Sequence, residues 1–302
     1  MIPAAVHYEI PHPTITQGFG SEVNYYAIDG KEYILRHVPK AVFNQELHIL
    51  QEIAASGIGP ELINHNSERS LFLLSFIPGE VLPSFSHRSQ SAYFATVRQL
   101  RRLHQITLGD DERAHWPFYL IYDEYEKLQK NEIPYPPSLD KAICRIKEIE
   151  KAVASFPKAL CHNDFHRNNV IISPAGPKII DWSTAALGDP YFDLAKLCIT
   201  LPRAFKIELL HHYLAHRATK VERAHLYLME QTLLMVMALH RYSKSEGTLV
   251  ENLPQPADFF RYPRSSEEFL NTSLQALHAF LIQTDSKRFR SALNLCHQSI
   301  HR

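Results

Sequence analysis

The chain has 302 residues, of which 45% are hydrophobic and 21% charged, with 32 basic and 32 acidic side chains. This composition excludes long disordered or collagen-like segments, and the zero net charge argues against a nucleic-acid partner, which normally requires a basic excess. The four cysteines form no C-x-x-C pair, which argues against a disulfide framework or a cysteine zinc site. No apolar run reaches the ~18 residues of a spanning helix, and no signal sequence is recognised, so we expect a cytoplasmic protein without a membrane partner.

Residues 1–77 are predicted to form strands around one helix. Two segments rich in β-branched and aromatic residues, Val23–Ile28 and Glu32–Val38, flank Asp29-Gly30, a pair that suits a tight hairpin turn. Apolar residues then recur at helical spacing from Phe43 to Ile53. Two more strands are expected over 61–66 and 71–76.

Residues 78–302 are predicted to be mostly helical, with the clearest helices over 89–104 and 138–153. One segment of strands and loops, Leu160–Asp181, interrupts the helices. The fold class that we predict is therefore α+β, with two lobes. A small antiparallel β-rich N-terminal lobe (1–77) would be joined to a larger helical C-terminal lobe (78–302).

The segment Leu160–Asp181 carries the main chemical signal. His162, Asp164 and Asn169 follow the pattern H-x-D-x-x-x-x-N, and Asp181 ends the second apolar strand of the predicted hairpin. Two carboxylates and an amide oxygen suit Mg²⁺, which prefers oxygen ligands and substrate phosphates. Each residue alone would serve equally well in a turn or a helix cap, but the ordered set matches the catalytic loop and metal-binding Asp of kinases.

The N-terminal segment supplies groups that suit a phosphate. Arg36 lies in an otherwise apolar strand, where an unpaired cation would be costly, and Glu46 on the next predicted helix is placed to pair with it. A glycine-containing loop precedes the first predicted hairpin, and its backbone N–H groups could cover phosphates; alternatively it is an ordinary hairpin turn. The residues of this loop are Gly18, Phe19, Gly20 and Ser21.

Together these motifs resemble the aminoglycoside phosphotransferase and choline kinase superfamily, a branch of the protein-kinase-like fold. The resemblance runs from about Gly18 to Ala195 and is strongest from His162 onward. The sequence Gly188-Asp189-Pro190-Tyr191-Phe192-Asp193-Leu194-Ala195 is similar to the G-D-P-x-x-D-L-A element of the family. The resemblance implies an ATP-dependent phosphotransferase with a two-lobed kinase-like fold. In that fold the N-terminal lobe (1–77) would bind the nucleotide, and the C-terminal lobe (78–302) would carry the catalytic loop and the substrate site.

Several residue roles follow from this resemblance. It implies that Asp164 is the catalytic base, that Asn169 and Asp181 are Mg²⁺ ligands, and that Arg36 with Glu46 forms a phosphate clamp. It also implies that the linker from Ser75 to Ile77 offers backbone groups to the adenine of ATP.

The spacing after Asp181 bears on the acceptor. Gly188 follows Asp181 by only seven positions, which leaves no long activation segment such as protein kinases use to hold a peptide. We therefore expect the acceptor to be a hydroxyl group of a small metabolite, with cationic ones among the candidates, as in aminoglycoside, choline, ethanolamine and thiamine kinases.

Within that group, the sequence disfavours choline. Choline kinases typically carry an acidic residue two positions after the metal-binding Asp and a tryptophan pair on a late helix, whereas this chain has Ser183 and the segment Leu234–Leu239. Quaternary ammonium groups favour aromatic cages. The tyrosines Tyr119, Tyr122 and Tyr125 could line a cationic pocket or form the aromatic face of an ordinary helix.

A reading from a different class is a nucleotide-binding pseudokinase that acts as an interaction module. The joint presence of Asp164, Asn169 and Asp181 argues against it, since an inactive site usually lacks one of them. The sequence does not indicate an oligomeric state.

Overall fold

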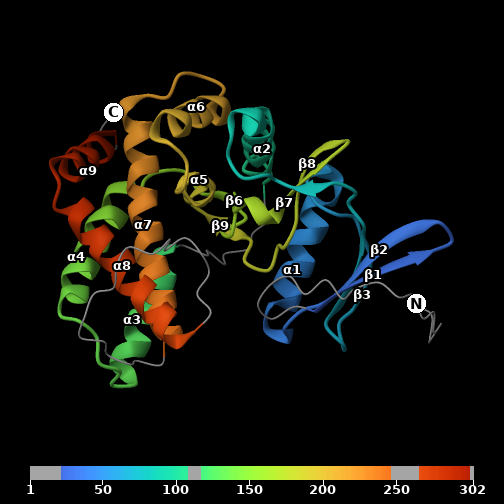
Figure 1. Ribbon diagram of the computed structural model, residues 1–302, viewed down its shortest axis with the longest axis horizontal. Helices are drawn as coiled ribbons and strands as arrows, with labels where there is room; N and C mark the ends of the chain where they lie inside the picture. The colour runs from blue at the N-terminus through green and yellow to red at the C-terminus, as the bar shows by residue number, and fades with distance from the viewer. Residues whose placement is uncertain (1–21, 108–116, 246–264, 300–302) are drawn as a thin grey trace. The chain divides into compact units, whose positions relative to one another are not determined.

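The computed structural model describes residues 22–107, 117–245 and 265–299 (Figure 1). The chain forms two compact units, one from residues 1–112 together with 160–186, the other from 113–159 together with 187–302. These units follow compactness and have other boundaries than the predicted lobes, 1–77 and 78–302. The division into those two lobes therefore stays a prediction. The glycine-containing loop at 18–21 lies outside the described residues.

The first unit is built on a four-stranded antiparallel sheet of order β1-β2-β4-β3. Asp29 and Gly30 form the predicted turn between β1 and β2, with φ angles of 51° and 73°. The helix α1 packs on the sheet through Phe43, whose ring stacks on that of Phe72 in β4 at 4.6 Å between centroids. These elements are β1 (Glu22–Ile28), β2 (Lys31–His37), α1 (Lys40–Ile53), β3 (Leu62–Asn66) and β4 (Leu71–Ser75).

A second sheet in this unit has the order β5-β7-β8 and contacts α2. In the β7–β8 hairpin Val170 pairs with Ile179 and Ser173 pairs with Gly176, so the turn lies at 174–175. The chain reaches β5 through Gly79, whose φ of 144° suits glycine alone. The elements are β5 (Glu80–Val81), α2 (Gln90–Leu103), β7 (Val170–Ser173) and β8 (Gly176–Ile179). Two short strands, β6 (Ala159–Cys161) and β9 (Ala186–Gly188), lie where the chain passes between the units.

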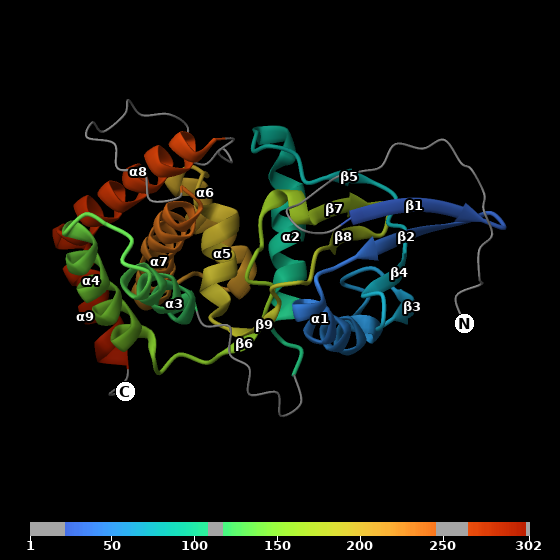
Figure 2. The ribbon, with the colours of Figure 1, turned by 90° about the horizontal axis from the view of Figure 1, so that it is seen from below.

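The second unit is helical and is organised around one long buried helix, α7, which contacts α3, α4, α5, α8 and α9 (Figures 1 and 2). Thr219 and Glu222 form a capping box that starts α7. The helices are α3 (Pro117–Lys130), α4 (Ser138–Val153), α5 (Pro190–Cys198), α6 (Arg203–Leu214), α7 (Lys220–Lys244), α8 (Ser266–Thr284) and α9 (Lys287–Ser299).

A buried polar pair joins α5 to α7. Asp189 caps α5 by accepting a hydrogen bond from the N–H of Tyr191 at 2.8 Å, and its other oxygen lies 2.7 Å from Nε2 of His225. The side chains of Asp189 and His225 are 2% and 1% exposed. A buried carboxylate needs such partners, so this pair fixes the start of α5 against α7.

The predicted α+β class and the predicted helices and strands are confirmed. The helices expected over 89–104 and 138–153 are α2 and α4. No helix in the described ranges is both long and apolar enough to cross a membrane.

Candidate active site

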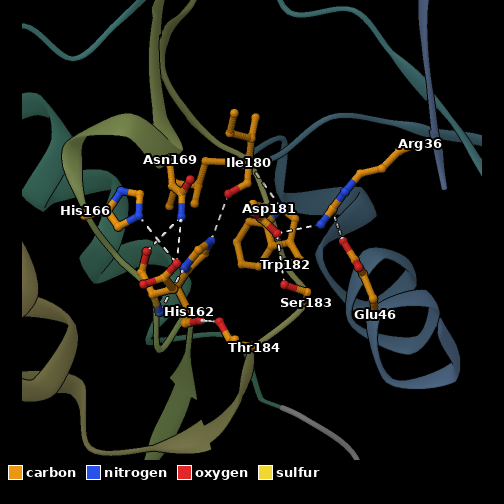
Figure 3. A network of polar contacts seen from close by, with 12 residues as sticks. Arg36, Glu46, His162, His166, Asn169, Ile180, Asp181, Trp182, Ser183 and Thr184 are labelled. Atoms are coloured by element: carbon orange, nitrogen blue, oxygen red, sulfur yellow. Dashed lines mark hydrogen bonds and ion pairs between the residues drawn. The ribbon is translucent and has the colours of Figure 1, made fainter. Parts of the chain in front are cut away.

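The polar loop after β6 is anchored at its start by His162. Nε2 of this fully buried imidazole lies 2.9 Å from the carbonyl oxygen of Ile180, and its Nδ1 accepts a hydrogen bond from the N–H of Asp164 at 3.3 Å (Figure 3). These two partners define the tautomer that carries its proton on Nε2. His162 therefore ties the backbone of Asp164 to the strand end that precedes Asp181.

Asn169 closes the same loop from its other end. Its Nδ2 donates to the carbonyl oxygen of Asp164 at 2.9 Å and lies 3.4 Å from the carboxylate Oδ2. The amide nitrogen is thus used within the loop, which leaves Oδ1 as the atom suited to a cation. Asn169 is 7% exposed, so its position is set by packing as well as by these bonds.

The β7–β8 hairpin brings Asp181 to this loop. The N–H of Ile180 donates to the carbonyl oxygen of Asn169 at 3.0 Å, which continues the pairing of Val170 with Ile179 by one position. Asp181 is the next residue, with a φ of 66°, a left-handed conformation that Asp adopts more readily than most residues. The hairpin register therefore places the two predicted metal ligands at the open base of the hairpin.

Arg36 connects this base to the N-terminal sheet. Its guanidinium donates through one nitrogen to Glu46 on α1 and through the other to Oδ1 of Asp181 at 2.6 Å (Figure 3). The side chain of Arg36 is 9% exposed, and its bond to the buried Glu46 is shielded from water. The predicted pairing of Arg36 with Glu46 is present, and the bond to Asp181 is an addition that the sequence does not reveal.

Glu46 is the most buried acid of this cluster, with 1% of its side chain exposed. Burial raises the pKa of Glu46 from 4.5 to about 7; Arg36 opposes the change and the negative charge of Asp181 adds to it. The effect of burial prevails because one guanidinium is shared between two carboxylates and cannot fully compensate both.

The segment after Asp181 is fastened to the loop of residues 162–169 by side chains that the sequence prediction did not include. The hydroxyl of Ser183 donates to Oδ1 of Asp181 at 3.0 Å. The hydroxyl of Thr184 donates to the carbonyl of His162 at 2.9 Å, while Nδ2 of Asn163 donates to the carbonyl of Thr184 at 3.0 Å. Asn163 lies inside the recognised motif, but nothing in the local pattern marks Thr184.

Trp182 follows Asp181, and its indole packs closely against Gly59. The indole is 1% exposed, and its Nε1 donates to the carbonyl of Ile179 at 3.2 Å. A Cβ atom on Gly59 would lie 3.0 Å from that indole nitrogen and 3.0 Å from the side chain of Ile53. The glycine after α1 thus allows the α1 end to approach the Asp181 segment.

His166 is a further residue that the sequence prediction did not include. Its Nε2 lies 3.4 Å from Oδ2 of Asp164, and its backbone N–H donates to the carbonyl of Asp164 at 2.9 Å. Its position two residues after Asp164, within the motif, is the signal that could have identified it.

The charges and exposure of the site suit a divalent cation. The carboxyl groups of Glu46 and Asp181 share the guanidinium of Arg36, and Asp164 adds a third acidic side chain beside Asn169. The side chains of Asp164 and Asp181 are 37% and 35% exposed, so a ligand can reach both. Carboxylate oxygens with the amide oxygen of Asn169 form a donor set that fits Mg²⁺.

The linker expected to meet adenine follows β4. The N–H of Ser75 donates to the carbonyl of Glu61 at 2.9 Å, so that group is already used. Within the described residues the peptide groups of Ile77 make no backbone hydrogen bond. Ile77 is therefore the better placed of the two to offer backbone groups to a ligand.

The sheet, the hairpin and this loop geometry define the protein-kinase-like class, as predicted. The chain belongs to the phosphotransferase enzyme family called APH, whose family pattern matches residues 14–227. It is 25% identical to protein LicA of Haemophilus influenzae over 186 residues and 25% identical to thiamine kinase of Escherichia coli over 200 residues. These matches cover 56% and 62% of this chain and 66% of each relative.

Solved structures show the same fold along nearly the whole chain. A choline/ethanolamine kinase family protein from Mesorhizobium loti superimposes with a TM-score of 0.75 at 17% sequence identity. The match covers 97% of this chain and 94% of the other.

Proposed function

We propose that this protein is a Mg²⁺-dependent small-molecule kinase that transfers the γ-phosphoryl group of ATP to a hydroxyl group. The observation that carries the proposal is the hydrogen-bonded arrangement of Asp164, Asn169 and Asp181, with Arg36 bonded to the last of them. Membership of the phosphotransferase family and the kinases among its relatives support the same reaction class.

In this proposal each residue has a distinct task. The Asp164 carboxylate accepts the proton of the acceptor hydroxyl while the oxygen of that hydroxyl bonds to the γ-phosphorus. At the same time the bond between the γ-phosphorus and the β–γ bridging oxygen breaks, and ADP is released. Asn169 and Asp181 would hold Mg²⁺, which when bound neutralises charge on the ATP phosphates. Arg36, oriented by Glu46, would contact the phosphates, and Ile77 would meet the adenine.

The acceptor that we propose is a small alcohol rather than a peptide. The helix α5 begins at Pro190, soon after Asp181, so the intervening segment is short and is used for Ser183, Thr184 and β9. The named relatives include a thiamine kinase and a choline/ethanolamine kinase family protein, which supports an amino alcohol or a similar cationic acceptor.

Choline itself we propose to be a poor acceptor. Ser183 carries no charge, and its hydroxyl already bonds to Asp181. Tyr242, which might have replaced a missing tryptophan, is 4% exposed and donates its hydroxyl to the carbonyl of Pro134. Tyr122 and Tyr125 of α3 donate to Glu150 and Asp140 of α4, at 2.6 Å each, which favours the aromatic-face reading over a cationic pocket.

The decisive experiment measures ADP release from Mg-ATP with a panel of amino alcohols, thiamine and aminoglycosides. For the best acceptor, Asp164→Ala should lower turnover by ~10²- to 10⁴-fold while ATP binding stays near normal, because only the proton acceptor is lost. Asp285→Ala removes an exposed carboxylate of the second unit as a matched control and should leave turnover unchanged. Unchanged turnover in Asp164→Ala would refute the proposal, and ATP binding without turnover on any acceptor would favour the pseudokinase reading.

A further inference from the structure

The second unit contains a cavity of about 270 Å³ that is lined by residues of α6, α7 and α9. None of its lining residues belongs to the active site described above. Its charged lining consists of five cations and one carboxylate, namely Arg203, Lys206, Lys220, Arg223, Arg288 and Glu230. In a chain whose net charge is zero, this is a marked local excess of positive charge.

Four of the five cations have no acidic partner within the described part of the chain. Lys206 pairs with Glu230 at 2.5 Å and also donates to a backbone carbonyl at 3.2 Å. Nε of Arg223 donates only to the backbone carbonyl of Thr219 at 3.2 Å. The guanidinium of Arg288 lies 3.9 Å above the ring of Tyr227, so its position is set by stacking while its N–H groups stay available. The cavity thus concentrates like charges that repel one another.

Two of these cations, Arg203 and Arg288, also occupy unfavourable positions on their helices. Helix N-termini carry partial positive charge and normally favour acidic residues in the first turn. The helices α6 and α9 have no acid there and instead begin with Arg203 and Lys287-Arg288. An anion in the cavity would relieve both the repulsion between side chains and the unfavourable interaction with the two helix termini.

We propose that this cavity binds a phosphate-bearing small molecule with at least two negative charges. Guanidinium groups suit phosphate because their planar fork can donate two parallel hydrogen bonds. Apolar side chains of Ile207, Leu210 and Leu295 complete the wall, which favours an organic phosphate over inorganic phosphate. The residues of this site and of the proposed active site do not overlap, so the two can be tested independently.

The test is titration calorimetry on the full chain with inorganic pyrophosphate and phenyl phosphate as probes, in EDTA to suppress Mg²⁺-dependent phosphate binding elsewhere. The double variant Arg203→Gln with Arg288→Gln should weaken binding by at least ~10-fold, because two charge-assisted contacts are lost. Arg203→Gln alone should weaken binding less, and since Arg203 is exposed it keeps the test valid if the double variant unfolds.

The matched control removes two exposed cations of the same unit that do not line the cavity, by Lys151→Gln with Arg217→Gln. Its affinity should equal that of the wild type. If the control variant lost as much affinity for the probes as the cavity variants, binding would depend only on the overall charge of the protein, and the proposal would be overturned. Undiminished binding in both cavity variants, or no binding by the wild-type protein in the millimolar range, would also overturn it. Kinase activity in these variants has no bearing on the outcome, so failure of this proposal and of the proposed function remain distinguishable.

Discussion

Replacing Glu46 by Gln should abolish the pH dependence that this one carboxyl gives to folding. The side chain is 1% exposed, and its pKa rises from 4.5 to about 7 on folding, chiefly through burial. Between these values the folded state binds more protons than the unfolded state, so the free energy of unfolding decreases as the pH rises. At ~1.36 kcal/mol per pKa unit, the loss amounts to ~3 kcal/mol by pH 8.

Gln has nearly the same shape and can still accept the hydrogen bond from Arg36, but it does not titrate. The difference in free energy of unfolding between Glu46→Gln and the wild type should therefore shift by ~3 kcal/mol in favour of the variant from pH 4.5 to pH 8. Most of this shift should occur below pH 7, because the wild type loses stability there. The same variant should lose activity, because Arg36 would be held less firmly for the phosphate.

Urea unfolding followed by circular dichroism, in EDTA at a series of pH values, measures this difference. Glu61→Gln, a substitution of an exposed acid in the same unit, reports the effect of total charge alone. A constant difference between Glu46→Gln and wild type across the pH range would show that Glu46 is charged throughout. In that case Arg36 would compensate the charges of both carboxylates in the folded protein.

Three further perturbations test the site and its supports. Asp181→Asn should raise the Mg²⁺ concentration needed for ATP binding by about tenfold or more, since a neutral oxygen replaces a carboxylate; an unaltered Mg²⁺ titration at fixed ATP would contradict this. Gly79→Ala should destabilise the fold by ~2–4 kcal/mol, because φ is 144° and the new Cβ would lie 2.3 Å from the carbonyl oxygen of Ile172; a urea midpoint equal to wild type would disprove it. Asp189→Ala should lower the free energy of unfolding by ~2–4 kcal/mol, because α5 loses its cap and His225 loses its buried partner. Thermal unfolding measures this loss, and a change below ~0.5 kcal/mol would show that the Asp189–His225 pair does not support the fold.

Local chemistry explains which parts of this fold could be predicted from the sequence. The Asp29-Gly30 turn and the helix over 138–153 depend on backbone preferences and apolar spacing within a few residues, and both are present. The catalytic loop and Asp181 were recognisable because their separation is fixed by a short loop and a tight hairpin.

Long-range pairing explains what could not be predicted. The bond between Arg36 and Asp181 joins residues 145 positions apart, and no spacing rule selects that partner over Glu46 alone. The roles of Thr184 and Asn163 likewise depend on two segments that meet only after folding. The tyrosines of α3 were ambiguous because one sequence pattern suits both a substrate pocket and contacts with a neighbouring helix.

The β7–β8 hairpin has a practical consequence for protein engineering. Asn169 and Asp181 are positioned from its base, whereas the tip at Pro174 and Ala175 is exposed, and the N–H of Ala175 donates to the hydroxyl of Ser173 at 3.2 Å within the turn. Extra residues at the tip would be absorbed beyond the last strand pair, but a single residue inserted within either strand would shift the pairing and turn the following side chains to the opposite face. The tip is therefore a suitable position for a fluorophore or an affinity tag that leaves the site intact.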